Sequence, residues 1–88
     1  MSSPTVEVLY FASLREALAR ERESVALPGG VATAGALRAW LRARGEPYAT
    51  ALAETRAVRV AVDQVMASTE TPLRDGTEVA FFPPVTGG

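Results

Sequence analysis

The stretch TAGALRAWLRARG, residues 33–45, is the clearest helix in the sequence and sets the predicted fold. Thr33 is a suitable N-cap, because its hydroxyl can accept a hydrogen bond from the free N–H groups of the first turn. An apolar stripe follows at helical spacing, formed by Leu37, Trp40 and Leu41. Arg44 and Gly45 are typical of a helix end, since a cation suits the negative end of the helix dipole and glycine tolerates positive φ. A helix of this kind can cover one face of a small sheet.

Short runs of β-branched and aromatic residues lie on both sides of this helix and predict strands. They are residues 6–11, 23–27, 57–62, 65–66 and 78–82. Turn-forming residues separate several of them, namely Pro28-Gly29-Gly30, Asp63-Gln64 and Arg74-Asp75-Gly76. Two shorter helices are predicted as well, one that starts at Ser13 as its cap and one over residues 48–54. The order predicts an α+β roll in which a mixed sheet packs on one main helix with short extra helices.

Composition excludes many kinds of site. The chain has 88 residues, enough for one domain, and a net charge of −1, which gives no nucleic-acid footprint. It has no His and no Cys, so it lacks thiolate nucleophiles and the usual zinc ligands. All nine cationic residues are Arg, so no side-chain amine can form a Schiff base or accept an isopeptide bond. No apolar run approaches the roughly 20 residues of a membrane span, and no signal peptide is visible, so we expect a cytoplasmic protein without membrane contact.

No self-contained active site is visible in the sequence. The Asp and Glu residues are scattered, and no His or Lys could activate a Ser or Thr nucleophile. The charged run Arg20-Glu21-Arg22-Glu23 is expected to be a solvated loop or helix end. Trp40 and Tyr48 are expected to pack in or beside the core. We therefore predict no metal site and no cofactor bound by this chain.

The last six residues, 83–88, are the one compositional break, so we predict a domain at 1–82 and a flexible tail at 83–88. Pro83 and Pro84 end the last strand and stiffen the base of the tail. Gly87 and Gly88 have no Cβ, so they can thread a slot too narrow for other residues. Six extended residues reach about 20 Å, enough to enter a pocket of another protein. A frayed chain end is the plain alternative.

Three segments resemble molybdopterin synthase small subunits, also called sulfur carrier subunits. They are VLYFASLRE at residues 8–16, VAVDQ at 60–64 and PLRDGTEVAFFPPVTGG at 72–88, of which the last is the most specific. Asp63 departs from the Asn that is frequent in the family. The resemblance implies a ubiquitin-like β-grasp fold. It also implies that an E1-like adenylating enzyme activates Gly88 with ATP and that a sulfur donor protein converts it to a thiocarboxylate.

The same resemblance implies the partner and the pathway. Two carriers would bind a dimer of the large subunit to form a heterotetramer, and each tail would enter a large-subunit active site. There the sulfur would pass to cyclic pyranopterin monophosphate in molybdenum cofactor biosynthesis. The chain would thus be a non-catalytic, sulfur-carrying subunit of a heteromeric synthase.

Strand alternation gives an independent prediction of the docking surface. Glu7 and Glu78 should mark the solvent face of the sheet, yet apolar residues share that face with them. An exposed apolar patch of this kind often binds partners. The predicted partner-binding residues are Leu9, Phe11, Arg15, Met66, Phe82, Pro83, Pro84, Val85 and Thr86, with Ala80 on the same face and Arg74 as a further rim residue. The alternative is that loops or helices of the chain itself cover this face.

Three other functions remain open from the sequence. The chain could be a sulfur carrier for thiazole synthesis or tRNA thiolation, since those carriers share the fold and the Gly-Gly end. It could be a ubiquitin-like protein modifier, although the missing Lys disfavours self-chains. It could also be a passive interaction domain with an idle tail. The approach to the tail, Phe81 to Val85, favours the molybdopterin branch by resemblance.

Overall fold

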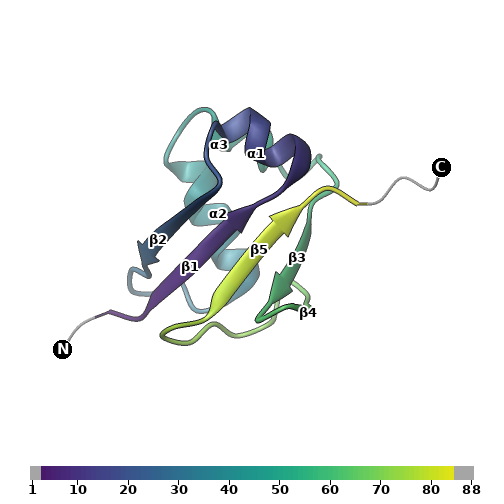
Figure 1. Ribbon diagram of the computed structural model, residues 1–88. Coiled ribbons are helices and arrows are strands. Elements are labelled where there is room, and N and C mark those ends of the chain that lie inside the picture. The colour runs from purple at the N-terminus through teal and green to yellow at the C-terminus, as the bar shows by residue number, and fades with distance from the viewer. Residues whose placement is uncertain (1–2, 85–88) are drawn as a thin grey trace.

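The strands and helices follow one another in the order predicted from the sequence (Figure 1). The computed structural model describes residues 3–84. The elements are β1 (Thr5–Tyr10), α1 (Ala12–Leu18), β2 (Arg22–Ala26), α2 (Ala34–Ala43), α3 (Tyr48–Ala51), β3 (Arg59–Val62), β4 (Val65–Met66) and β5 (Glu78–Phe82).

Five strands form one mixed sheet in the order β2-β1-β5-β3-β4. The two central strands, β1 and β5, run parallel, whereas every other neighbouring pair is antiparallel. The last strand therefore inserts between the first and the third, and the helices pack behind the sheet as Figure 1 shows. This arrangement confirms the predicted α+β, ubiquitin-like β-grasp roll.

Helix α2 forms as its sequence predicts. The backbone N–H of Ala36 donates to the Thr33 hydroxyl at 3.2 Å, which satisfies one of the free donors of the first turn. Arg44 is the C-cap, and Gly45 follows with φ of 100°, a conformation that favours glycine. Leu37 and Leu41 are fully buried beneath the sheet. The apolar stripe thus supplies the packing that holds the short helix.

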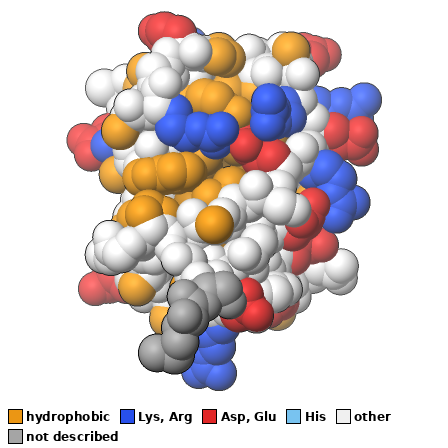
Figure 2. All heavy atoms as spheres, turned by 90° about the vertical axis from the view of Figure 1, so that its left-hand side faces the viewer, with side chains coloured by type: hydrophobic (Ala, Val, Ile, Leu, Met, Phe, Trp, Pro, Cys, Tyr) orange, Lys and Arg blue, Asp and Glu red, His pale blue; other side chains and the backbone are white. Residues whose placement is uncertain are grey.

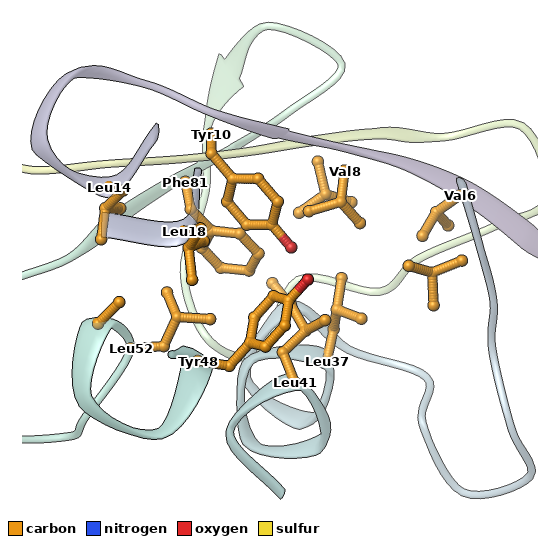
Figure 3. Close-up of a cluster of buried hydrophobic side chains, with 14 of the residues drawn as sticks. Val6, Val8, Tyr10, Leu14, Leu18, Leu37, Leu41, Tyr48, Leu52 and Phe81 are labelled. Carbon is orange, nitrogen blue, oxygen red and sulfur yellow. The ribbon is translucent and has the colours of Figure 1, made fainter. Parts of the chain in front are cut away.

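The core lies between the inner face of the sheet and the helices (Figure 3). Val6, Val8 and Tyr10 of β1 alternate inward, as the period of two predicts. Phe81 of β5 stacks on Tyr10 with ring centroids 6.4 Å apart. Side chains of α1, α2 and α3 close the cluster, including Leu14, Leu18, Leu37, Leu41, Tyr48 and Leu52.

Three local predictions are wrong. Ser13 does not cap α1: it lies inside the helix, and Phe11 takes the N-cap position without a side-chain bond. The helix predicted over residues 48–54 ends at Ala51, and β3 begins at Arg59 instead of residue 57. Beyond α3, the guanidinium of Arg38 donates to the carbonyls of Leu52, Ala53 and Arg56 at 2.9, 2.6 and 3.1 Å, which ties this segment to α2. Those carbonyls are satisfied by a side chain instead of a continued helix.

The charged run at residues 20–23 is not simply solvated, because Glu23 lies inward on β2. It pairs with Val8, and its side chain is only 8% exposed. One carboxylate oxygen, Oε2, accepts from the hydroxyls of Tyr10 and Tyr48, each at 2.8 Å. The hydroxyl groups of Tyr10 and Tyr48 point toward each other in Figure 3. Glu23 therefore joins β1, β2 and α3 through one buried carboxylate.

Two arginines complete this cluster on the other carboxylate oxygen of Glu23. Arg44 and Arg20 donate to Oε1 at 3.0 and 3.1 Å. The Arg44 guanidinium also lies over the rings of Tyr48 and Trp40, 4.7 and 5.3 Å from their centroids. Figure 2, which views the side that β2 borders, shows cationic and acidic side chains next to one another beside an apolar strip. Burial raises the pKa of Glu23, but the hydrogen bonds from Tyr10, Tyr48 and Arg44 outweigh it and leave that pKa lowered.

Candidate partner-binding face

The sheet face opposite the helices, here called the open face, carries an apolar row across four strands. The register aligns Leu9 with Ala80, Ala80 with Ala61, and Ala61 with Met66. The inward neighbours Val60 and Val79 pack on the core, so alternation directs this row outward. Directly opposed side chains have Cβ atoms about 4.5–5.5 Å apart, which makes the row continuous.

The apolar side chains of the open face differ in exposure. Met66 is 58% exposed and Phe11 is 46% exposed, so the chain's own loops do not cover them. Leu9 and Phe82 are partly buried within the sheet surface. Ala80 is buried at 8%, since it is small and lies between Leu9 and Ala61. The expected exposure therefore holds for Phe11 and Met66, is lower for Leu9 and Phe82, and is wrong for Ala80 at the centre of the patch.

Phe11 extends the open face beyond the end of β1. Its backbone is extended, with φ of −124° and ψ of 155°, so strand alternation continues and directs it to the same face as Leu9. The Phe11 N–H donates to the Phe81 carbonyl at 3.2 Å, which continues the β1–β5 ladder by one residue. Phe11 and Phe82 are therefore neighbours at the point where β5 ends. Arg15 is exposed one helical turn further on, and its N–H donates to the Phe11 carbonyl at 3.4 Å.

The base of the predicted tail rises from the middle of the sheet. Because β5 lies between β1 and β3, Phe82 delivers Pro83 and Pro84 between two other strands rather than at a sheet edge. Both prolines are partly buried. The remaining predicted site residues, Val85, Thr86, Gly87 and Gly88, lie outside the described residues. The structure thus brings together Phe11, Phe82 and the prolines at one end of the open face.

Two residues of the open face were not predicted from the sequence. Arg59 lies directly opposite Phe82, and Ala61 lies opposite Ala80. The alternation of Val58, Val60 and Val62 could have assigned both to the outer face, but only the register shows that they adjoin Phe82 and Ala80. Val65 is also 68% exposed, yet it pairs with the inward Val62 and so borders the opposite face of the sheet.

Acidic residues gather at the end of the open face away from the tail. Glu7 accepts from Arg22 at 2.9 Å and from Ser24 at 2.7 Å. The bond from Ser24 and the one from Arg22 lower the pKa of Glu7. Glu78 is the register partner of Glu7, and Asp63 accepts from the Glu78 N–H at 3.0 Å. This end of the face therefore presents carboxylates to a partner.

The described residues offer little to a small molecule. A cavity of about 30 Å³ lies between α2 and β3, room for about one water molecule. A larger hollow of about 160 Å³, lined by Asp63, Gln64 and Glu78, is shallow and open to solvent. Within residues 3–84, no cluster of three or more metal-ligating side chains is present. In the same range, no helix has the length and apolar character to cross a bilayer. The chemistry that this arrangement favours is the docking of another protein on the open face.

Comparison with known proteins matches the chain to the model of the ThiS family over residues 8–88. It is 42% identical to the molybdopterin synthase sulfur carrier subunit of Escherichia coli (strain K12), over 94% of this chain and 99% of that protein. The corresponding subunit of Haemophilus influenzae is 40% identical over the same shares.

Solved structures are similar as well. SAMP1 from Haloferax volcanii has a TM-score of 0.73 and 26% identity, covering 96% of this chain and 99% of that one. A chain in the protein–protein complex of subunits 1 and 2 of molybdopterin-converting factor from Helicobacter pylori has a TM-score of 0.63 and 27% identity, again covering 96% and 99%.

Proposed function

Because the chain belongs to the ThiS family, we propose that it is the sulfur carrier subunit of a molybdopterin synthase and carries sulfur on Gly88. The observation that carries the proposal is the agreement of two features. Its sequence relatives bear that name over nearly their whole length. The open face also presents exposed apolar side chains, with Phe11 beside the end of β5, the strand that precedes the tail, and Met66 on β4.

The proposed chemistry begins with a poor electrophile, the carboxylate of Gly88. One carboxylate oxygen attacks the α-phosphorus of ATP on a separate E1-like enzyme, and pyrophosphate leaves. A sulfide equivalent from a sulfur donor protein then forms a C–S bond as the bond to AMP breaks, which yields the thiocarboxylate. Nothing in the described chain could catalyse either step, so the chain acts as substrate and carrier.

The proposed acceptor is cyclic pyranopterin monophosphate in the active site of the large subunit. The Helicobacter pylori complex of subunits 1 and 2 supports such a partner. We propose that Phe11, Met66 and Phe82 dock on the large subunit, with Leu9 beneath them and Arg15 at the rim. Pro83, Pro84, Val85 and Thr86 would then guide the tail into the active site, where Gly87 threads the entrance. Two carriers on a large-subunit dimer would form the heterotetramer, in the cytoplasm.

The intact mass of the chain tests this proposal. The protein is purified from a host that contains its activating and sulfur-donating enzymes. We expect the mass change of one oxygen replaced by sulfur, located by fragmentation at Gly88. The matched control lacks Gly88 and should show no change although it folds alike. An unmodified mass, with both enzymes shown to be active, would contradict the thiocarboxylate mechanism.

A second function, protein modification, is favoured by one observation. The small archaeal modifier protein SAMP1 is similar in fold and 26% identical. A modifier would use the same adenylate but transfer the acyl group to an amine of another protein. Incubation with activating enzyme, ATP and a cell extract separates the two: a modifier forms amide-linked conjugates, whereas a dedicated carrier yields only the thiocarboxylate.

A further inference from the structure

Arg59 takes no part in the core or in the proposed sulfur chemistry. It is exposed on β3, and the register sets it directly opposite Phe82, the last residue before the two prolines. Directly opposed side chains lie about 4.5–5.5 Å apart at Cβ. The guanidinium therefore projects from the open face beside the base of the tail.

Five of the nine arginines have internal partners, whereas within residues 3–84 the side chains of Arg15, Arg56, Arg59 and Arg74 have none. Arg20, Arg22, Arg42 and Arg44 form ion pairs, and Arg38 donates to backbone carbonyls. Within residues 3–84, none of the ion pairs includes Arg59. Its charge is therefore available to a partner that covers the open face.

On the open face, positive charge lies at the end near the tail and negative charge lies at the opposite end. Arg59 and Arg15 flank Phe82 and Phe11 at the tail end. Glu78 and Asp63 occupy the opposite end, about 13 Å away along the strands at 3.3 Å per residue. The apolar row of Leu9, Ala80, Ala61 and Met66 separates the two ends. A partner can match this pattern in only one of two opposite orientations.

We propose that Arg59 pairs with a carboxylate of the tail-receiving partner, which lies beside the entrance that admits the tail. This inference rests on the proposed function, with the large subunit as the occupant. At the rim of the docked face, the positive charge of Arg59 is matched by a negative group on the partner, because interfaces bring complementary charges together. A carboxylate is the group that matches the planar fork of Arg in a bidentate contact. Because rim charges act mainly on encounter and orientation, the pair fixes the direction in which the tail enters.

Association kinetics with the purified large subunit test the pair at low and at high salt. Arg59→Glu should weaken binding at low salt about tenfold or more, chiefly through a slower association rate, and the loss should shrink at high salt. Arg59→Gln should lie between Arg59→Glu and the unaltered chain. The matched control is Arg56→Glu, an exposed charge reversal before β3 at a residue whose backbone carbonyl accepts from Arg38 of α2, on the helix side of the sheet. We expect little change in its affinity.

Each outcome decides a different question. If Arg59→Glu binds like the unaltered chain, or if Arg56→Glu weakens binding equally, the proposed pair is wrong although the carrier function stands. If the unaltered chain does not bind the large subunit, both the pair and the proposed function fail. Thermal unfolding of the variants is measured in parallel, because an exposed strand position should leave the unfolding midpoint unchanged.

Discussion

Replacing Glu23 by Gln should destabilise the fold far more than replacing a surface Glu by Gln. The carboxylate is 8% exposed and accepts four hydrogen bonds, from Tyr10, Tyr48, Arg44 and Arg20. Gln keeps one acceptor oxygen for the tyrosine hydroxyls. Its NH₂ group then faces the two guanidinium groups of Arg20 and Arg44. These groups are all hydrogen-bond donors, so both arginines lose their acceptor and their opposite charge.

The expected loss follows from these contacts. Breaking a fully buried ion pair costs about 3–5 kcal/mol. The side chains of Arg20 and Arg44 are 47% and 34% exposed, so water compensates part of that cost. We therefore expect a loss of about 2–3 kcal/mol in the free energy of unfolding. For a domain of this size this corresponds to a fall of at least about 10 °C in Tm.

Urea unfolding followed by circular dichroism and by the fluorescence of Trp40 measures this loss. Glu7→Gln is the matched control, because Glu7 also accepts from an Arg and a hydroxyl group but lies on the sheet surface. We expect little effect from the control. The difference in unfolding free energy between Glu23→Gln and the unaltered chain should also become smaller as the pH is lowered. The lowered pKa of Glu23 stabilises the fold above the ordinary value of 4.5, and this stabilisation is lost as the carboxylate protonates. Equal losses in both variants would refute the assignment of Glu23 as a buried junction.

Three further predictions concern the tyrosines, a helix contact and the open face. Burial, followed by the bond to Glu23, raises the pKa of Tyr10 and of Tyr48 above the ordinary value of 10.0. Stability should therefore fall as pH rises above about 10. Ultraviolet absorbance should show both phenols ionising together with unfolding, and ionisation of a still folded chain would contradict this. Gly35→Ala should cost about 1–3 kcal/mol, because a Cβ there would lie 2.8 Å from Thr69 Cβ and 2.9 Å from Thr69 O. Gly29→Ala, with nothing within 4 Å, should be tolerated, and urea unfolding compares the two. Met66→Ala should weaken binding to the large subunit while the unfolding midpoint stays unchanged; Val65→Ala, on the same strand but facing the other way, should not weaken binding. Equal affinities of the two variants in a titration would argue against docking on the open face.

Local signals predicted most of the fold correctly. The cap at Thr33, the stop at Gly45 and the inward alternation of β1 follow from chemistry within a few residues, and the structure reproduces them. The turn at Asp63-Gln64 was also predicted correctly from local sequence. Both residues have positive φ, 49° and 67°, as a tight hairpin turn requires. Where a distant group intervened, local prediction was wrong. The segment after α3, predicted to be helical, is instead bound by Arg38, which lies 14 to 18 positions away in the sequence.

The residues of the candidate site also fall into those that the sequence predicted and those that only the strand pairing showed. Alternation alone assigned Leu9 and Phe82 to the open face, because side-chain direction in a strand depends only on position. The burial of Ala80 was missed, since it depends on the two strands that flank β5. The position of Arg59 beside Phe82 was missed for the same reason.

By itself, the sequence determined the element order, the inner and outer faces, and the chemistry that the chain lacks, because composition, period and caps are local properties. Only the tertiary structure decided which strands are neighbours, and that choice created the functional features. It inserted β5 between β1 and β3, so the base of the tail lies among Phe11, Phe82 and Arg59. It also turned Glu23 from a member of a charged run into a buried junction, since donors of Tyr10, Arg44 and Tyr48, 13 to 25 positions away, converge on one carboxylate beside the local donor of Arg20. Pairing across long stretches of chain depends on global packing, which no short window of sequence contains.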